Sequence, residues 1–116
     1  MHNFKDIVVT LRLEHRKSRR RRVLKGGRIF YNNYCFSCDC IIRNENDSGM
    51  QLKVDSGALV PTEFAILNRK DGTLANARMV WHKDTQIGIE FLSKFADVRD
   101  SSREHIRQMS VLVTSG

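Results

Sequence analysis

Apolar and polar positions alternate along the middle of this chain, a pattern typical of β-strands with one buried face. Short alternating or aromatic-rich stretches follow one another, separated by turn residues. We expect strands at residues 29–31, 34–43, 50–54, 63–69, 73–81 and 86–92. Turns recur roughly every 6 to 12 residues, and Asp71-Gly72 offers the positive φ of a tight hairpin. The spacing predicts a mainly β domain, folded as a small antiparallel barrel or sandwich.

The last part of the chain changes to a helical period. Ser101 and Glu104 have the spacing of a capping box, in which each side chain bonds a backbone N–H group near the helix start. Apolar residues then recur on one helical face at Ile106, Met109, Leu112 and Val113. We therefore expect a C-terminal α-helix over about residues 102–113. Near the other end, residues 10–13 also alternate and predict a short strand.

Charge is concentrated in one segment of the chain. The 116 residues include 20 Lys and Arg against 13 Asp and Glu, a net charge of +7. Nine of the basic residues lie within residues 12–28 with a single acid, and we call residues 14–28 the basic arm. Arginine side chains match phosphate oxygens and the edge of guanine, although such a run can also be a solvated, mobile tail. The Gly26-Gly27 pair predicts a bend where the arm joins the first barrel strand.

Several classes of protein are excluded at this stage. No stretch reaches the roughly 18 apolar residues of a membrane-spanning helix, and the N-terminus does not resemble a signal peptide. These features predict a cytoplasmic protein with reduced thiols. Cys35, Cys38 and Cys40 fit small buried apolar residues better than a metal or redox site, and we place Trp81 and Phe91 in the core. No catalytic or metal-ligand spacing is present, so we expect neither an enzyme nor a cofactor.

A polar stretch at residues 44–49, which we call the 44–49 loop, contains two asparagines. If the chain there is extended, Asn44 and Asn46 point to the same side of the sheet and could read a base edge or hold a phosphate. Asn, Asp, Ser and Gly are also ordinary turn formers, so the stretch on its own favours a plain turn.

These motifs occur in an order that is similar to a known family. Arg-x-x-x-Arg at residues 16–20 precedes Asn-x-Asn-x-x-Gly at 44–49, and Val-Trp at 80–81 and Ile-Gly-Ile-Glu-Phe at 87–91 follow. The arrangement resembles the PilZ domain, the bacterial receptor module for cyclic di-GMP, over residues 14–92. The family signature has Ser where this chain has Asn46, which keeps hydrogen-bonding groups but adds bulk beside the ligand.

The resemblance implies a six-stranded antiparallel PilZ-like β-barrel, with residues 1–13 before it and a helical tail at 93–116. It also implies that arginines of the arm grip the phosphates and guanines of cyclic di-GMP, above a floor formed by the 44–49 loop. The ligand residues expected on this basis are Arg16, Arg19, Arg20, Arg21, Asn44, Asn46 and Gly49.

The function expected from the sequence is a non-enzymatic cyclic di-GMP receptor that relays its signal by conformational change and contact with a downstream protein. One alternative is a degenerate PilZ-like interaction domain that binds no ligand. Another is a nucleic-acid-binding domain that uses the arm on backbone phosphates. This last reading is less favoured, because no aromatic residues alternate with the arginines to stack on bases.

Overall fold

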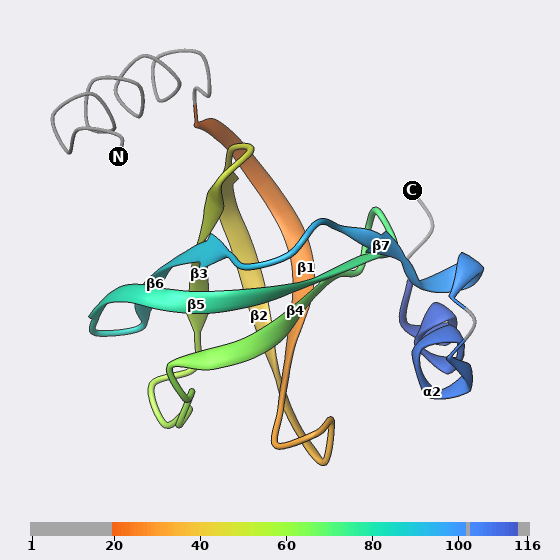
Figure 1. Ribbon diagram of the computed structural model, residues 1–116. Helices are drawn as coiled ribbons and strands as arrows, with labels where there is room; N and C mark the ends of the chain where they lie inside the picture. Colours follow the sequence, from red (N-terminus) through yellow and green to blue (C-terminus); the bar gives the residue numbers. More distant parts are fainter. Residues whose placement is uncertain (1–19, 102, 114–116) are drawn as a thin grey trace, which may run out of the picture.

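The computed structural model describes residues 20–101 and 103–113 of the chain (Figure 1). Its strands lie in the order β4-β1-β2-β3-β6-β5-β7, and pairing of β4 with β5 closes six of them into an antiparallel barrel. The strands are β1 (Arg21–Tyr31), β2 (Phe36–Glu45), β3 (Gly49–Val54), β4 (Glu63–Asn68), β5 (Thr73–Lys83), β6 (Gln86–Phe91) and β7 (Ala96–Asp97). The mainly β class and the six-stranded antiparallel barrel are therefore confirmed.

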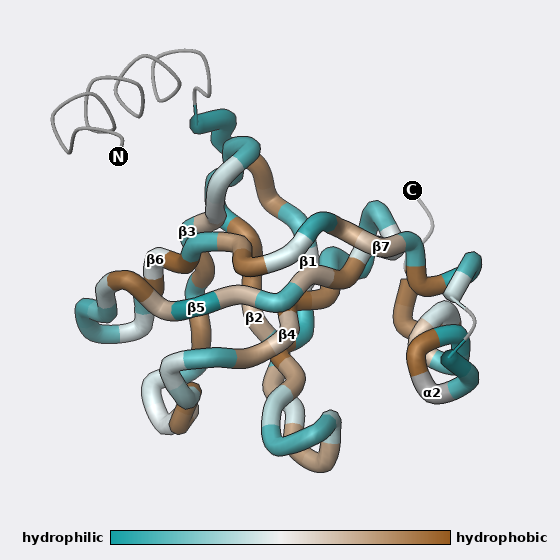
Figure 2. Tube along the Cα trace, viewed as in Figure 1, coloured by the Kyte–Doolittle hydropathy of each residue, from teal (hydrophilic) through white to brown (hydrophobic). Residues whose placement is uncertain are grey.

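The barrel interior is filled by the apolar residues of the alternating pattern, which appear as brown positions along the strands in Figure 2. Its most deeply buried members include Ile29, Ile42, Leu52, Ile66 and Ile87. The Asp71-Gly72 turn joins β4 to β5 with Gly72 at φ 73°, as the sequence predicts. Burial of one face of every strand supplies the main stabilisation of this closed sheet.

The second half of the basic arm is part of the barrel and not a separate arm. Residues 21–28 belong to β1, which pairs with β2 throughout and with β4 from Gly27 onward. The predicted bend at Gly26-Gly27 is therefore wrong. Gly27 is required for another reason: a Cβ there would lie 2.9 Å from Cys40 Sγ and 3.2 Å from the Leu67 carbonyl oxygen. Glycine lets β1 pass between its two neighbours.

Two strand boundaries differ from the sequence prediction because of backbone geometry at the turns. Asn32, Asn33 and Tyr34 all have positive φ, between 51° and 67°, so the β1–β2 turn continues past Tyr34 and β2 begins at Phe36. At the other end β2 continues to Glu45, which shortens the predicted polar loop. Three left-handed residues in a row could not be read from the alternation alone.

The continuous helix predicted over residues 102–113 is not confirmed. The segment instead contains one α-helical turn, α2 (Glu104–Arg107), and the 3-10 helix η2 (Gln108–Leu112), and the 3-10 helix η1 (Val98–Asp100) precedes it. The Ser101 hydroxyl accepts a hydrogen bond from the Arg103 backbone N–H and does not cap a long helix. So short a helix depends on tertiary packing, and Ile106 and Met109 pack on the outside of the barrel against Phe30 and Leu74.

Candidate functional site

A groove with a volume of about 460 Å³ crosses the outer face of the barrel over β1, β2, β3 and β6. Figure 1 shows the start of β1 beside the β2–β3 connection at one end of the barrel. The groove is lined by Arg22, Val23, Leu24, Arg43, Asn44, Gln51, Lys53 and Gln86. Its charged residues are all basic, which makes it the candidate site for an anionic ligand.

Two adjacent irregularities shape this groove. The register of β1 against β2 shifts between Arg22 and Lys25, and the register of β2 against β3 shifts between Ile42 and Asn44. Such β-bulges bend a strand and redirect side chains that strict alternation would send to the other face. The two bulges lie on neighbouring strands, so together they direct several consecutive side chains toward one surface.

A chain of side-chain hydrogen bonds runs across the groove floor. Arg20 Nη1 donates to Asn44 Oδ1 at 3.0 Å, and Asn44 Nδ2 donates to Gln51 Oε1 at 2.6 Å. Gln51 Nε2 in turn donates to Gln86 Oε1 on β6. Each amide oxygen accepts from the group before it, so the whole chain has one hydrogen-bonding direction. The floor is thus polar, ordered and uncharged.

Asn46 and Gly49 are both used within the 44–49 loop. Asn46 Oδ1 accepts from the backbone N–H groups of Ser48 and Gly49, each at 2.9 Å, and from the Ser48 hydroxyl at 3.0 Å. A Cβ at Gly49 would overlap the carbonyl oxygen of Ile89 on β6. Asn44 reaches toward β3 while Asn46 turns into its own loop, so the structure does not bring these two side chains together.

Glu45 separates these two asparagines and is buried, with 8% of its surface exposed. Lys25 Nζ donates to Glu45 Oε1 at 2.8 Å and to Asp71 Oδ2 at 3.2 Å, and Arg21 Nη2 lies 3.5 Å from the same Glu45 oxygen. Burial lowers the pKa of Lys25, but the hydrogen bonds to the two carboxylates outweigh it and raise that pKa above its ordinary value. Arg21, the neighbour of the groove residue Arg22 in β1, is therefore paired with an acid that faces the barrel.

The sequence predicts Trp81 in the core, but the structure places it on the outer face of the barrel. Its side chain is 40% exposed, and its indole covers Gly88 on the outer face, where a Cβ would overlap it. Gly88 pairs with Trp81 on one side and with Gln51 on the other, so the indole neighbours the groove floor. Phe91 packs against the barrel core, as predicted.

The cysteines divide into two kinds. Cys38 and Cys40 pack in the barrel interior as predicted, and burial raises the pKa of Cys40 to about 12. Cys35 is exposed in the β1–β2 turn, so the prediction that it is buried is wrong. All three thiols are free, and no group of three or more His, Cys, Asp or Glu among the described residues could hold a metal ion.

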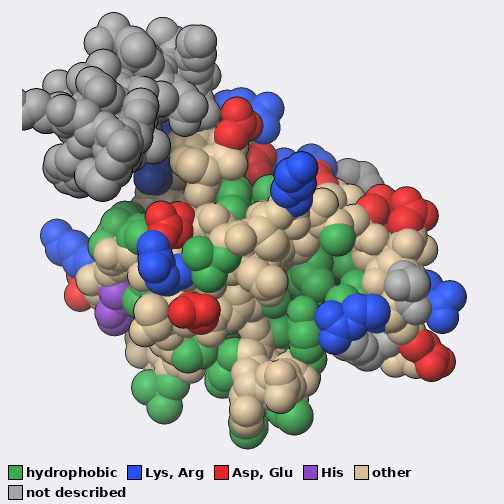
Figure 3. All heavy atoms as spheres, in the orientation of Figure 1, with side chains coloured by type: hydrophobic (Ala, Val, Ile, Leu, Met, Phe, Trp, Pro, Cys, Tyr) green, Lys and Arg blue, Asp and Glu red, His purple; other side chains and the backbone are tan. Residues whose placement is uncertain are grey.

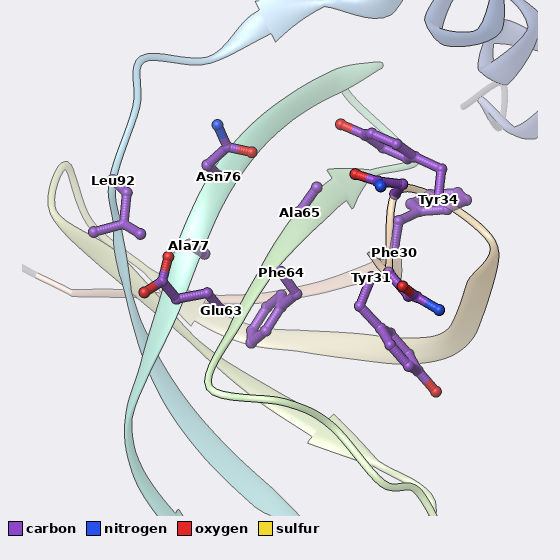
Figure 4. Close-up of a pocket in the computed structure, with 11 residues that line it drawn as sticks. Phe30, Tyr31, Tyr34, Glu63, Phe64, Ala65, Asn76, Ala77 and Leu92 are labelled. Atoms are coloured by element: carbon purple, nitrogen blue, oxygen red, sulfur yellow. The ribbon is translucent and has the colours of Figure 1, made fainter.

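A second hollow of about 340 Å³ lies elsewhere on the barrel surface, between the β1–β2 turn and Leu92 (Figure 4). Figure 3 shows hydrophobic side chains gathered between the barrel and the C-terminal segment, where Phe30 and Tyr34 also line a separate, adjoining hollow. In the hollow of Figure 4, Ala65 forms part of the floor, and Tyr34 and Asn76 lie at the sides. Among the described residues, Glu63 is the only charged one that lines it, so this hollow does not suit an anionic ligand.

The structure places the predicted site residues unequally. Arg20 and Asn44 are in direct contact, and Arg21 lies beside them through Glu45. Arg16 and Arg19 lie outside the described residues. The other groove residues were not among the predicted ligand residues: Arg22, Arg43, Gln51, Lys53 and Gln86. The only available signal was that Gln51 and Lys53 occupy the polar positions of an alternating strand.

Comparison with protein-family models gives no match, and comparison with curated proteins gives no significant match. Within the part of the chain that the structure describes, no helix has the length and apolar character needed to cross a bilayer.

Proposed function

We propose that this protein is a PilZ-like receptor for cyclic di-GMP, which relays the signal by conformational change and contact with a downstream protein. The observation that carries the proposal is the 3.0 Å hydrogen bond from Arg20 to Asn44. It joins two motifs 24 residues apart, one able to hold phosphate and guanine and the other able to form a floor beneath them.

The surroundings of this contact support the same ligand. Cyclic di-GMP carries two phosphates and two guanines, and the adjoining groove presents cations, side-chain amides and the exposed Leu24. Such a lining suits a ligand that is both anionic and planar. Receptor function needs no catalytic group, so the proposal adds no chemistry that the site would have to perform.

A titration tests this function directly. Cyclic di-GMP, GMP and duplex DNA are each added at two salt concentrations, and binding is followed by calorimetry. Trp81, the sole tryptophan of the chain, provides a second signal because it neighbours the groove. Saturable binding of cyclic di-GMP well above GMP is expected. Binding only to DNA, with a steep loss at high salt, would indicate a nucleic-acid-binding protein instead.

Arg20→Ala should weaken cyclic di-GMP binding roughly 10- to 100-fold, the effect of losing a charge-assisted hydrogen bond worth about 1.5–3 kcal/mol. The side chain is exposed, so unfolding stability should change by less than about 0.5 kcal/mol. Arg107→Ala is the matched control, an exposed arginine in α2 far along the chain from the groove. Equal affinity in both variants would remove Arg20 from the site.

A specific observation favours a second candidate, a domain of the same fold that binds proteins and no nucleotide. Asn46 and Gly49 are explained fully by the loop and by the contact with β6, without a ligand. In that case these two signature residues serve the barrel structure and not a ligand.

Asn46→Ser tests what Asn46 does in a receptor, while the wild-type titration separates the two candidates, because only a receptor binds cyclic di-GMP. Serine restores the usual residue of the family signature and can still accept from the loop N–H groups, more weakly than asparagine. A receptor should then bind cyclic di-GMP equally or more tightly, measured by the same calorimetry, at a stability cost of about 1 kcal/mol or less. A strong loss of affinity in a folded variant would show that Asn46 itself contacts the ligand.

A further inference from the structure

Three cations of the groove have no acidic partner in the part of the chain that the structure describes. Arg22 on β1, Arg43 on β2 and Lys53 on β3 are all exposed, and none forms an ion pair with any described residue. Other basic residues on the same strands are neutralised locally: Lys25 by Glu45 and Arg28 by Asp39. Three like charges gathered around one groove repel each other unless an anion lies between them.

The positions of these cations suit a single phosphate group. Neighbouring strands lie about 4.8 Å apart, so the backbones of β1 and β3 are separated by roughly 10 Å. Long arginine and lysine side chains from both sides can close that span. Arg22 pairs in register with Asn44, and Lys53 pairs with Gln86, so the cations flank the chain of amides that forms the floor.

The floor discriminates between kinds of anion. The chain of amides from Asn44 through Gln51 to Gln86 offers neutral hydrogen-bonding groups, which do not repel a second, uncharged polar group of the ligand. Leu24, 76% exposed, adds an apolar contact at the rim. A phosphodiester that carries a sugar and a base matches this combination of cations, amides and an apolar wall better than a free inorganic ion.

We propose that this groove is a second anion subsite, in which Arg22, Arg43 and Lys53 hold one phosphodiester of the ligand over the amide floor. The inference rests on the proposed function, because it assigns the second phosphate of cyclic di-GMP while the basic arm, with Arg20, holds the first. The receptor therefore binds one phosphate through Arg20 and the other through cations carried by strands β1, β2 and β3 of the barrel.

The test compares Lys53→Met and Arg43→Gln with Lys70→Met, an exposed lysine of the β4–β5 turn outside the groove. Calorimetry with cyclic di-GMP at two salt concentrations should show a loss of roughly 10- to 100-fold for each groove variant and none for the control. The groove variants should also depend less on salt, since each has lost one charged contact. Thermal unfolding checks that all three variants are folded.

A second measurement does not depend on mutation. In nuclear magnetic resonance spectra of the wild-type protein, the side-chain NH₂ signals of Asn44, Gln51 and Gln86 should move on addition of cyclic di-GMP. Wild-type binding with unchanged affinity in both groove variants and with static amide signals would overturn the subsite and leave the proposed function intact. Absence of cyclic di-GMP binding in the wild type would overturn both. If Lys53→Met weakens binding of duplex DNA but not of cyclic di-GMP, the groove would be reassigned to nucleic-acid backbone.

Discussion

Gly49→Ala should destabilise the barrel by more than about 3 kcal/mol, the upper range for an overpacked interior site. Gly49 begins β3 and pairs with Glu90 on β6, and a methyl group there would overlap the Ile89 carbonyl oxygen. Backbone of a central strand pair cannot move aside as a flexible side chain can. Small domains are stable by only about 5–15 kcal/mol, so this loss is a large share of the total.

Gly57→Ala is the matched control, because apart from its chain neighbours no described residue has an atom within 4 Å of a Cβ at that position. Urea denaturation of both variants should show a large loss for Gly49→Ala and a change within about 0.5 kcal/mol for Gly57→Ala. If the two variants were equally stable, the barrel would not need this glycine. Close approach of a nucleotide would then be the better reason for it.

The barrel was predictable because its strands follow the simple rule of one buried face. Ile29, Leu52 and Ile87 lie at alternating positions within short segments, and each is fully or almost fully buried. Closure of the sheet does not follow from alternation, which fits a sandwich as well as a barrel. It depends on the pairing of β4 with β1, a contact between segments distant in sequence, in addition to the local hairpin of β4 with β5.

The errors in the fold prediction come from tertiary contacts that override local signals. The charge-rich residues 21–28 form a strand because Lys25 meets two carboxylates and Gly27 fits between two neighbours. The C-terminal segment has a helical apolar period, yet it breaks into short turns as it follows the outer surface of the barrel. The charge-rich composition suggested a mobile arm, and the apolar period suggested a helix. Neither composition nor period carries information about these tertiary contacts.

The candidate site was predictable only in part, for a related reason. Arg20 and Asn44 stood out because they belong to recognisable motifs. Gln51 and Gln86 did not, because polar residues on the outward face of a strand are ordinarily solvated. Their importance arises from the strand register, which places Gln51 beside Asn44. The Gln51 side chain then forms hydrogen bonds with the amides of Asn44 and Gln86. Two β-bulges, invisible to alternation, complete the groove.

Lys25→Met should destabilise the protein by about 2–4 kcal/mol, because it leaves a buried carboxylate without its closest cation. The side chains of Lys25 and Glu45 are 16% and 10% exposed, and their charged atoms are 2.8 Å apart. Arg21 is the remaining cation near Glu45, at 3.5 Å, and its own side chain is 75% exposed. Methionine keeps the length and apolar stem of lysine, so the measured loss reports mainly on the charge.

Two further variants identify the cause of that loss. Lys70→Met removes a charge from the exposed turn next to Asp71 and should change stability by less than about 0.5 kcal/mol. The double variant Lys25→Met with Glu45→Gln should recover part of the loss, because the unpaired buried charge is gone. A double variant less stable than Lys25→Met by the full cost of Glu45→Gln alone would show that the two side chains do not interact.

The pH dependence of the same loss provides an independent check. Contacts with Glu45 and Asp71 raise the pKa of Lys25 above its ordinary value of 10.5, so the folded protein holds this proton more tightly than the unfolded chain. The stabilisation is therefore complete below about pH 10 and disappears as the pH rises through the folded pKa. Chemical denaturation should give a constant gap between wild type and Lys25→Met from pH 7 to 9 and a narrowing gap above it. A gap that stays constant as the pH rises further would show that the charge of Lys25 does not cause the loss.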